Sequence, residues 1–257
     1  MNKFLFIIFL SGCFFGIYQR PRTVGEGNFD FSTGFALQFT SNPIDREYIE
    51  ARGYGLLGNF NIGFSYGILK GLDVGFNLSG AGLGPFLKIE LYNKKIGKTR
   101  HIFSITPYFL YDPFFSNSLG FRGDAIYTFV VNKYFEPFVF YQAYYHPYFE
   151  EFFQASAGYK PLGNVGNGYY QFFGLGSGFN IYIQQKRKSS KDISPDFRFN
   201  IELGFFPVYL SENRRVIPIL NFAISFGGPG FFKCYRIEKE TFCPGGIFLY
   251  IISALFS

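Results

Sequence analysis

Apolar and small polar residues alternate along most of this chain with a period of two. In residues 27–40 the odd positions are mainly Phe and Leu, whereas the even positions include Asn28, Asp30, Ser32 and Gln38. Successive side chains of a β-strand point to opposite faces, so the pattern predicts a strand with one apolar and one hydrogen-bonding face. Such a strand separates either a protein core from water or lipid from a wet lumen.

The same alternation recurs along the chain and predicts eleven strands in all. The expected strands are 27–40, 53–68, 72–80, 86–92, 102–111, 121–131, 137–145, 153–160, 169–183, 197–207 and 218–226. Bacterial barrels normally hold an even number of strands, and residues 246–256 supply a twelfth candidate, although the alternation fades there. Ten strands are the alternative, if residues 147–167 form one long loop and the barrel closes at Phe226.

The composition distinguishes between the two kinds of surroundings. Aromatic residues make up 23% of the 257 residues and charged residues only 16%. The polar face consists mainly of the small residues Gly, Asn and Ser, with a few charges. Such a face is not hydrophilic enough for a water-facing exterior, but it suits the inside of a barrel. No internal run has the roughly 20 apolar residues of a helical membrane span. We therefore predict an all-β fold, a transmembrane antiparallel up-and-down β-barrel of about 12 strands, rather than a soluble β-sandwich.

The first residues have the pattern of an export signal, with Lys3, an apolar run over 4–10 and then small residues. The last four of them, Leu10-Ser11-Gly12-Cys13, resemble the bacterial lipobox, in which cleavage before the cysteine frees it for acylation. An ordinary signal peptide with a chance cysteine is the alternative. The resemblance implies a lipoprotein signal peptide over 1–12, lipidated Cys13 as the mature N-terminus, a periplasmic linker over 13–26 and a barrel domain over 27–257.

Two further cysteines, Cys234 and Cys243, are close together near the C-terminal end of the sequence. Disulfides persist in the compartments to which an exported protein is sent, so we expect this pair to close a loop. A metal site would need more Cys or His nearby, and the two histidines, His101 and His146, are far away in sequence. We predict no metal site and no cofactor.

The formal net charge is +6, which raises the question of an anionic partner. The basic residues are concentrated in expected turns such as residues 93–100 and 184–192, away from the aromatic residues. This arrangement favours solvated loops that face lipid headgroups, and we expect no nucleic-acid binding.

Residues 21–39 and 54–91 resemble Gram-negative outer-membrane β-barrel proteins and lipoproteins. In that group the first strand follows a stretch like Thr23-Val24-Gly25-Glu26-Gly27, and a tight turn precedes a strand like the one that begins with Leu-Asp-Val-Gly at Leu72. The likeness covers residues 20–92 well and the remainder through alternation alone. It implies an outer-membrane location and a barrel architecture, but no substrate.

Several charged residues fall on positions expected to face the lumen. Arg198 and Glu202 share one strand face but lie roughly 13 Å apart along the strand, too far to pair directly. Charges in a narrow barrel must be compensated, so we expect a structural network across neighbouring strands. A selectivity constriction for a small polar solute is the functional alternative. The expected lumen charges are Lys88, Glu90, Arg122, Asp124, Arg198 and Glu202.

These observations predict a non-enzymatic outer-membrane lipoprotein, acting as a narrow channel or as a structural or surface component in contact with outer-membrane lipids. Neither His101 nor His146 lies in a convincing catalytic arrangement in the sequence, and a membrane-embedded lipid hydrolase or acyltransferase is the first alternative. The second alternative is an adhesin or partner-binding barrel that uses residues 184–196 and 228–245. With the N-terminus on the periplasmic side, we expect both of these loops outside.

Overall fold

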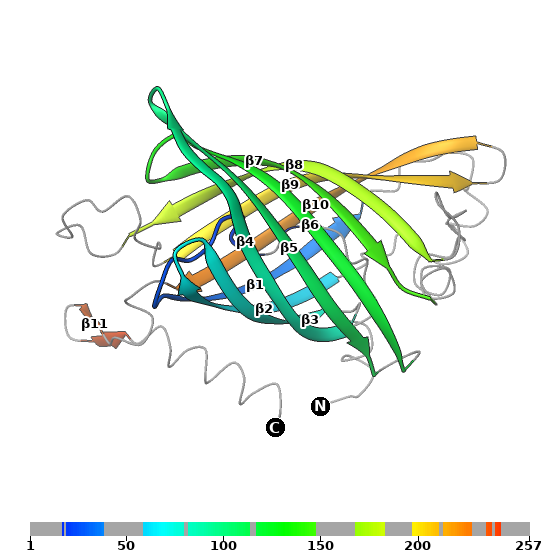
Figure 1. Ribbon diagram of the computed structural model, residues 1–257, viewed down its shortest axis with the longest axis horizontal. Helices are drawn as coiled ribbons and strands as arrows, with labels where there is room; N and C mark the ends of the chain where they lie inside the picture. The colour runs from blue at the N-terminus through cyan, green and yellow to red at the C-terminus, as the bar shows by residue number, and fades with distance from the viewer. Residues whose placement is uncertain are drawn as a thin grey trace.

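Ten antiparallel strands form one closed barrel (Figure 1). The computed structural model describes residues 17, 19–38, 59–79, 82–113, 117–147, 168–182, 197–210, 213–227, 235–237 and 240–242. The barrel strands are β1 (Phe29–Gln38), β2 (Asn59–Leu69), β3 (Leu72–Ser79), β4 (Gly82–Ile96), β5 (Thr99–Asp112), β6 (Ser118–Val130), β7 (Phe135–Tyr145), β8 (Tyr169–Ile181), β9 (Phe197–Leu210) and β10 (Asn213–Gly227). Among the described residues, no helix is long and apolar enough to cross a membrane.

The barrel closes where β1 pairs with β10 on one side and with β2 on the other. Phe31 lies opposite both Phe226 and Phe64, and the ring centroids are 6.2 and 5.3 Å apart. Only 3% of Phe31 is exposed. Aromatic pairs at such distances contribute about 0.5–1.5 kcal/mol beyond the area they bury, so this cluster stabilises the closure.

The strand count is ten, which was our alternative to twelve. β10 ends at Gly227 and pairs with β1, as the alternative with closure at Phe226 requires. Two expected strands, residues 153–160 and 246–256, lie outside the described residues. The short strands β11 (Tyr235–Ile237) and β12 (Glu240–Phe242) form a separate two-stranded sheet.

The outer face of the barrel carries large apolar side chains. Phe109 and Leu119 have 62% and 64% of their surface exposed. An exposed apolar band of this kind around a closed barrel is typical of a membrane-spanning β-barrel, in which these side chains face lipid. Other large apolar residues exposed on the strands are Leu87, Phe121, Val139, Tyr141, Phe173, Leu175, Phe179 and Ile181.

The inner face is polar, but it is closely packed. Buried uncharged polar residues on the strands include Ser32, Asn61, Ser65, Asn77, Ser104, Thr106, Thr128, Asn200, Asn221 and Ser225. Ser104, Thr128 and Asn221 have no exposed surface at all. The predicted alternation is therefore confirmed, and the described inward-facing polar side chains are buried within the protein.

Inward-facing aromatic rings fill part of this space, and they lie over glycines of neighbouring strands. Phe86 lies opposite Gly75, where an added Cβ would come within 2.1 Å of the Phe86 ring. Phe138 lies opposite Gly176, where the corresponding distance is 2.5 Å. Glycine in these strands thus provides room for a ring from the next strand.

The connections differ between the two ends of the barrel. The turn end, where β1 begins, has tight turns at residues 70–71 and 97–98, whereas the loop end has the connections 39–58 and 146–168. Because there are ten strands, the β8–β9 connection joins strand ends at the turn end. We expected residues 184–196 and 228–245 on the same side as the long loops, and this expectation is wrong because it counted one strand more before them. The strand ends that border these residues, those of β8, β9 and β10, all lie at the turn end.

Candidate functional site

The N-terminal part of the described chain lies inside the barrel. Ile17 and residues 19–24, here called the luminal segment, are all buried. The chain leaves the lumen through a turn in which Gly25 and Gly27 have φ of 87° and 71°, and β1 follows directly. We expected residues 13–26 to form a periplasmic linker, but the structure places the luminal segment among the inward-facing side chains instead.

Three carboxylates of the barrel wall accept hydrogen bonds from the luminal segment. The backbone N–H of Ile17 donates to Glu202 Oε2 at 2.7 Å, and that of Val24 donates to Asp73 Oδ2 at 2.8 Å. Thr23 donates to Glu90 Oε1 through both its backbone N–H, at 2.9 Å, and its hydroxyl, at 2.6 Å. These carboxylates come from β9, β3 and β4, so they hold the segment against three different strands.

Donors on the wall satisfy carbonyl oxygens of the same segment. Lys88 Nζ donates to the carbonyl of Arg20 at 2.5 Å, and Ser104 Oγ donates to that of Pro21 at 2.7 Å. Asn200 Nδ2 donates to the carbonyl of Gln19 at 3.4 Å. A buried backbone group without a partner costs about 1–3 kcal/mol, so this pairing makes burial of the segment possible.

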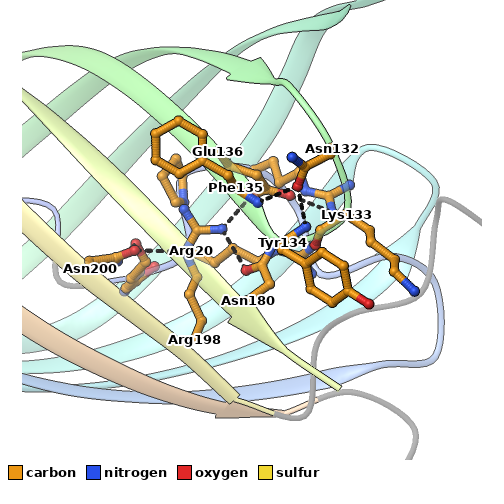
Figure 2. Close-up of polar contacts among 12 residues, drawn as sticks. Arg20, Asn132, Lys133, Tyr134, Phe135, Glu136, Asn180, Arg198 and Asn200 are labelled. Carbon is orange, nitrogen blue, oxygen red and sulfur yellow. Dashed lines mark hydrogen bonds and ion pairs between the residues drawn. The ribbon is translucent and has the colours of Figure 1, made fainter. Parts of the chain in front are cut away.

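An ion network centred on Glu136 of β7 joins the segment to the wall. Glu136 has no exposed surface and forms salt bridges with Arg22, at 2.8 Å, and with Arg198 of β9. Figure 2 shows Arg198 between Glu136, Asn180 and Asn200; its guanidinium donates to Asn200 Oδ1 at 2.7 Å and to Asn180 Oδ1 at 3.1 Å.

Arg20 of the luminal segment is also buried near this network. Arginine side chains keep their proton in proteins, so Arg20 and Arg22 together bring two positive charges into the lumen.

A second ion pair, between Arg122 and Asp124, lies on β6 and has further partners on β5 and β7. Arg122 donates to both carboxylate oxygens of Asp124, at 2.8 and 2.7 Å, and Gln142 donates to Asp124 Oδ1 at 2.7 Å. The Arg122 guanidinium also lies 4.6 Å from the centroid of the Tyr108 ring. Two-point pairing and ring stacking are arrangements that hold a guanidinium rigidly.

The six expected lumen charges are all on the inner wall, but they divide among different partners. Lys88, Glu90 and Glu202 bind the luminal segment, Arg198 belongs to the Glu136 network, and Arg122 pairs with Asp124. Glu90 is half-buried and the other five are buried. Arg198 pairs with Glu136 and Glu202 accepts from Ile17, so the two bind different groups, as their spacing predicts.

Sequence reasoning missed several members of these networks. Glu136 stands beside residues 137–145, where aromatic residues occupy both faces and the alternation is hard to follow. Arg20 and Arg22 were assigned to the linker. The signal that could have identified them is two arginines flanking a proline next to a predicted strand, a strongly charged stretch that needs carboxylate partners if it is buried.

The two histidines lie in different surroundings. His101 of β5 is half-buried, and its Nδ1 lies 3.0 Å from the hydroxyl of Tyr127. His146 is buried at the loop end, where its ring stacks on that of Tyr144.

His146 also lies close to a serine and an aspartate, which bears on the hydrolase alternative. Ser118 Oγ is 3.3 Å and Asp112 Oδ2 is 3.7 Å from His146, and both are measured to the same atom, Nε2. A catalytic triad needs the serine and the acid on opposite ring nitrogens, so that the acid orients the base. The arrangement in this structure does not meet that requirement.

The cysteines lie outside the described residues, and Cys13 stays a prediction. Cys234 and Cys243 stand next to β11 and β12, in which Tyr235 pairs with Phe242. The expected disulfide between these two cysteines likewise stays a prediction.

We expect a trypsin digest prepared without reductant to contain residues 234–236 joined to residues 240–257. Trypsin cuts after Arg236 and Lys239, so only a disulfide would hold these two peptides together. Mass spectrometry before and after reduction measures the link, and two separate peptides with blocked free thiols would contradict it.

Within the described part of the chain, no group of three or more His, Cys, Asp or Glu side chains is placed to hold a metal ion. No protein-family model matches the chain, and no curated protein does.

Solved structures that resemble the chain are outer-membrane β-barrel proteins. Ail, the attachment invasion locus protein of Yersinia pestis, is 13% identical with a TM-score of 0.30, over 79% of this chain and 99% of that chain. The NanC porin is 10% identical with a TM-score of 0.37, over 77% and 98%. The N-terminal β-barrel domain of Pseudomonas aeruginosa OprF is 7% identical with a TM-score of 0.24, over 79% and 98%.

Proposed function

We propose that this protein is an outer-membrane β-barrel without catalytic activity, whose lumen is closed by its own N-terminal segment and which serves as a surface or structural component. The observation that carries the proposal is the burial of Ile17 and residues 19–24 inside the barrel. Their backbone groups bind six wall residues, so this segment occupies the space that a solute would need.

If the lumen is closed, the protein contacts other molecules through the loop end of the barrel. Bacterial barrels have short periplasmic turns and longer extracellular loops. The connections 39–58 and 146–168 are the longest in the barrel, and both are at the loop end. We assign this end to the cell surface and the turn end to the periplasm, with the lipid anchor at Cys13 retained as part of the proposal.

Planar-bilayer recordings of the refolded full-length chain test the closed lumen. We expect no regular single-channel steps from protein whose folding is verified by the shifted mobility of unheated samples on a denaturing gel. Regular steps in most insertions would contradict the closed lumen. They would favour the second candidate, a narrow channel, for which the charged inner wall is the supporting observation.

The channel and hydrolase alternatives predict different effects of mutations. In a channel, Arg122→Ala would change the conductance, because Arg122 is a charged group on the inner wall. In a hydrolase, the wild type would cleave a phospholipid ester and Ser118→Ala or His146→Ala would abolish the cleavage. We expect no cleavage above the level of heat-unfolded protein, since Ser118 and Asp112 approach the same nitrogen of His146.

A further inference from the structure

We propose that the inner wall of the barrel is a binding site for an arginine-containing peptide, and that the luminal segment occupies this site as an internal ligand. The inference rests on the proposed closed lumen and adds to it the chemical class of ligand that the wall recognises.

The wall binds the segment mainly through its backbone. Glu202, Glu90 and Asp73 accept backbone N–H groups of the segment, and Lys88, Ser104 and Asn200 donate to three successive carbonyl groups. Contacts of this kind recognise the backbone of a peptide whatever its side chains, so they identify a peptide as the ligand but leave much of its sequence open.

Specificity for arginine comes from Glu136. Its carboxylate lies 2.8 Å from Arg22 Nη2 and has no exposed surface when the segment is bound, so the two charges pair away from water. Arginine suits such a carboxylate because its planar guanidinium presents several donors in a fixed geometry.

The charge of the wall also favours a cationic ligand. Without the segment, the described inner wall carries the carboxylates Asp30, Asp73, Glu90, Asp112, Asp124, Glu136 and Glu202 against the cations Lys88, Arg122 and Arg198. Seven carboxylates and three cations give a formal charge of −4. Arg20 and Arg22 offset half of this charge, and a peptide with two arginines would do the same.

The wall is shaped for a close backbone approach. A Cβ added at Gly63 of β2 would lie 3.0 Å from Gln19 Nε2, and one added at Gly67 would lie 1.9 Å from the carbonyl oxygen of Gly25. A side chain at Gly67 would therefore push the exit turn of the segment away from β2. The turn at Gly25 and Gly27 is the covalent link to β1, and rotation there would release the segment without unpairing a strand.

The test uses the full-length double variant Arg20→Glu/Arg22→Glu, in which two carboxylates replace the arginines and repel Glu136. The probe is a fluorescent synthetic peptide with the sequence of residues 17–26, IYQRPRTVGE, and binding is measured by anisotropy in detergent micelles or vesicles. We expect this variant to bind the peptide at least about tenfold more tightly than the wild type, whose site is occupied. A peptide with both arginines replaced by glutamate is expected not to bind.

A triple variant that adds Glu136→Gln should lose about tenfold or more of the affinity for the arginine peptide. If the double variant does not fold, Arg22→Gln replaces it in the binding test, because it removes one charge without reversing it. Equal binding by the wild type and the loosened variants would overturn the inference, as would binding that does not depend on the peptide's arginines.

The bilayer recording separates this inference from the proposed function. A wild type that conducts would overturn the closed lumen, and the peptide site with it. A closed wild type combined with loosened variants that do not bind the peptide would overturn the peptide site alone.

Discussion

Replacing Glu136 by alanine should lower the free energy of unfolding by about 3–5 kcal/mol, the usual cost of removing one partner from a buried ion pair. Glu136 has no exposed surface and is the carboxylate that pairs with both Arg22 and Arg198. Its removal leaves two buried guanidinium groups without this partner. Urea unfolding in lipid vesicles, followed by circular dichroism and by gel mobility, measures the loss.

Two control variants separate charge from packing at this position. Glu136→Gln keeps the shape of the side chain and should lose most of the same free energy, because the missing charge is the cause. Tyr141→Phe, on the lipid-facing side of the same strand, should leave the free energy of unfolding nearly unchanged. A Glu136→Ala variant as stable as the wild type would contradict the buried ion network.

Replacing Gly67 by alanine should detach the exit turn of the luminal segment from β2. The added Cβ would lie 1.9 Å from the carbonyl oxygen of Gly25, which is a backbone atom and has little freedom to move. The two backbone hydrogen bonds that tie Gly67 to Gly27 and Asn28 would then be strained. Overpacking of this kind costs about 1–3 kcal/mol.

Limited trypsin digestion detects the detachment. Both Arg22 and Thr23 are buried, so the bond between them should resist trypsin in the wild type and become cleavable in Gly67→Ala. Gly123→Ala is the matched control, because an added Cβ there meets nothing within 4 Å. Equal rates of cleavage after Arg22 in all three proteins would contradict the docking of the segment inside the barrel.

The strands and their faces could be predicted from the sequence because the alternation is a local signal. In β6, for example, Arg122 and Asp124 point inward and Phe121 outward, as their positions predict. Lipid outside and protein inside impose opposite requirements on successive residues, so each strand carries its own evidence. In β7 the sequence does not distinguish the two faces, because large apolar residues occupy both of them. Phe138 and Phe140 are buried inside, and Val139 and Tyr141 are exposed outside.

The strand count was harder to predict because closure is a long-range event. The pairing of Asp30 with Gly227 joins the first and the last strand of the barrel, which are far apart in sequence, and no local pattern specifies it. Counting a strand at residues 153–160 also reversed the expected side of every later connection. One additional strand therefore put both residues 184–196 and residues 228–245 on the wrong side.

The contents of the lumen could be predicted only in part. The alternation identified Lys88 and Glu202 as inward, but not that they bind Arg20 and Ile17 of a segment without strand periodicity. Such a segment carries no face pattern, and its partners come from the five strands β3, β4, β5, β7 and β9. Its position follows from the assembled barrel rather than from its own sequence.

The most direct test of the account uses single tryptophans as reporters, since the chain contains none. Phe172 and Phe173 are neighbours on β8, with 1% and 48% of their surfaces exposed. In vesicles, brominated lipids should quench Phe173→Trp strongly, whereas neither brominated lipids nor aqueous acrylamide should quench Phe172→Trp, because its ring lies in a filled lumen. Quenching of Phe172→Trp by acrylamide would contradict the closed lumen, and lack of lipid quenching in Phe173→Trp would contradict the membrane-facing outer wall.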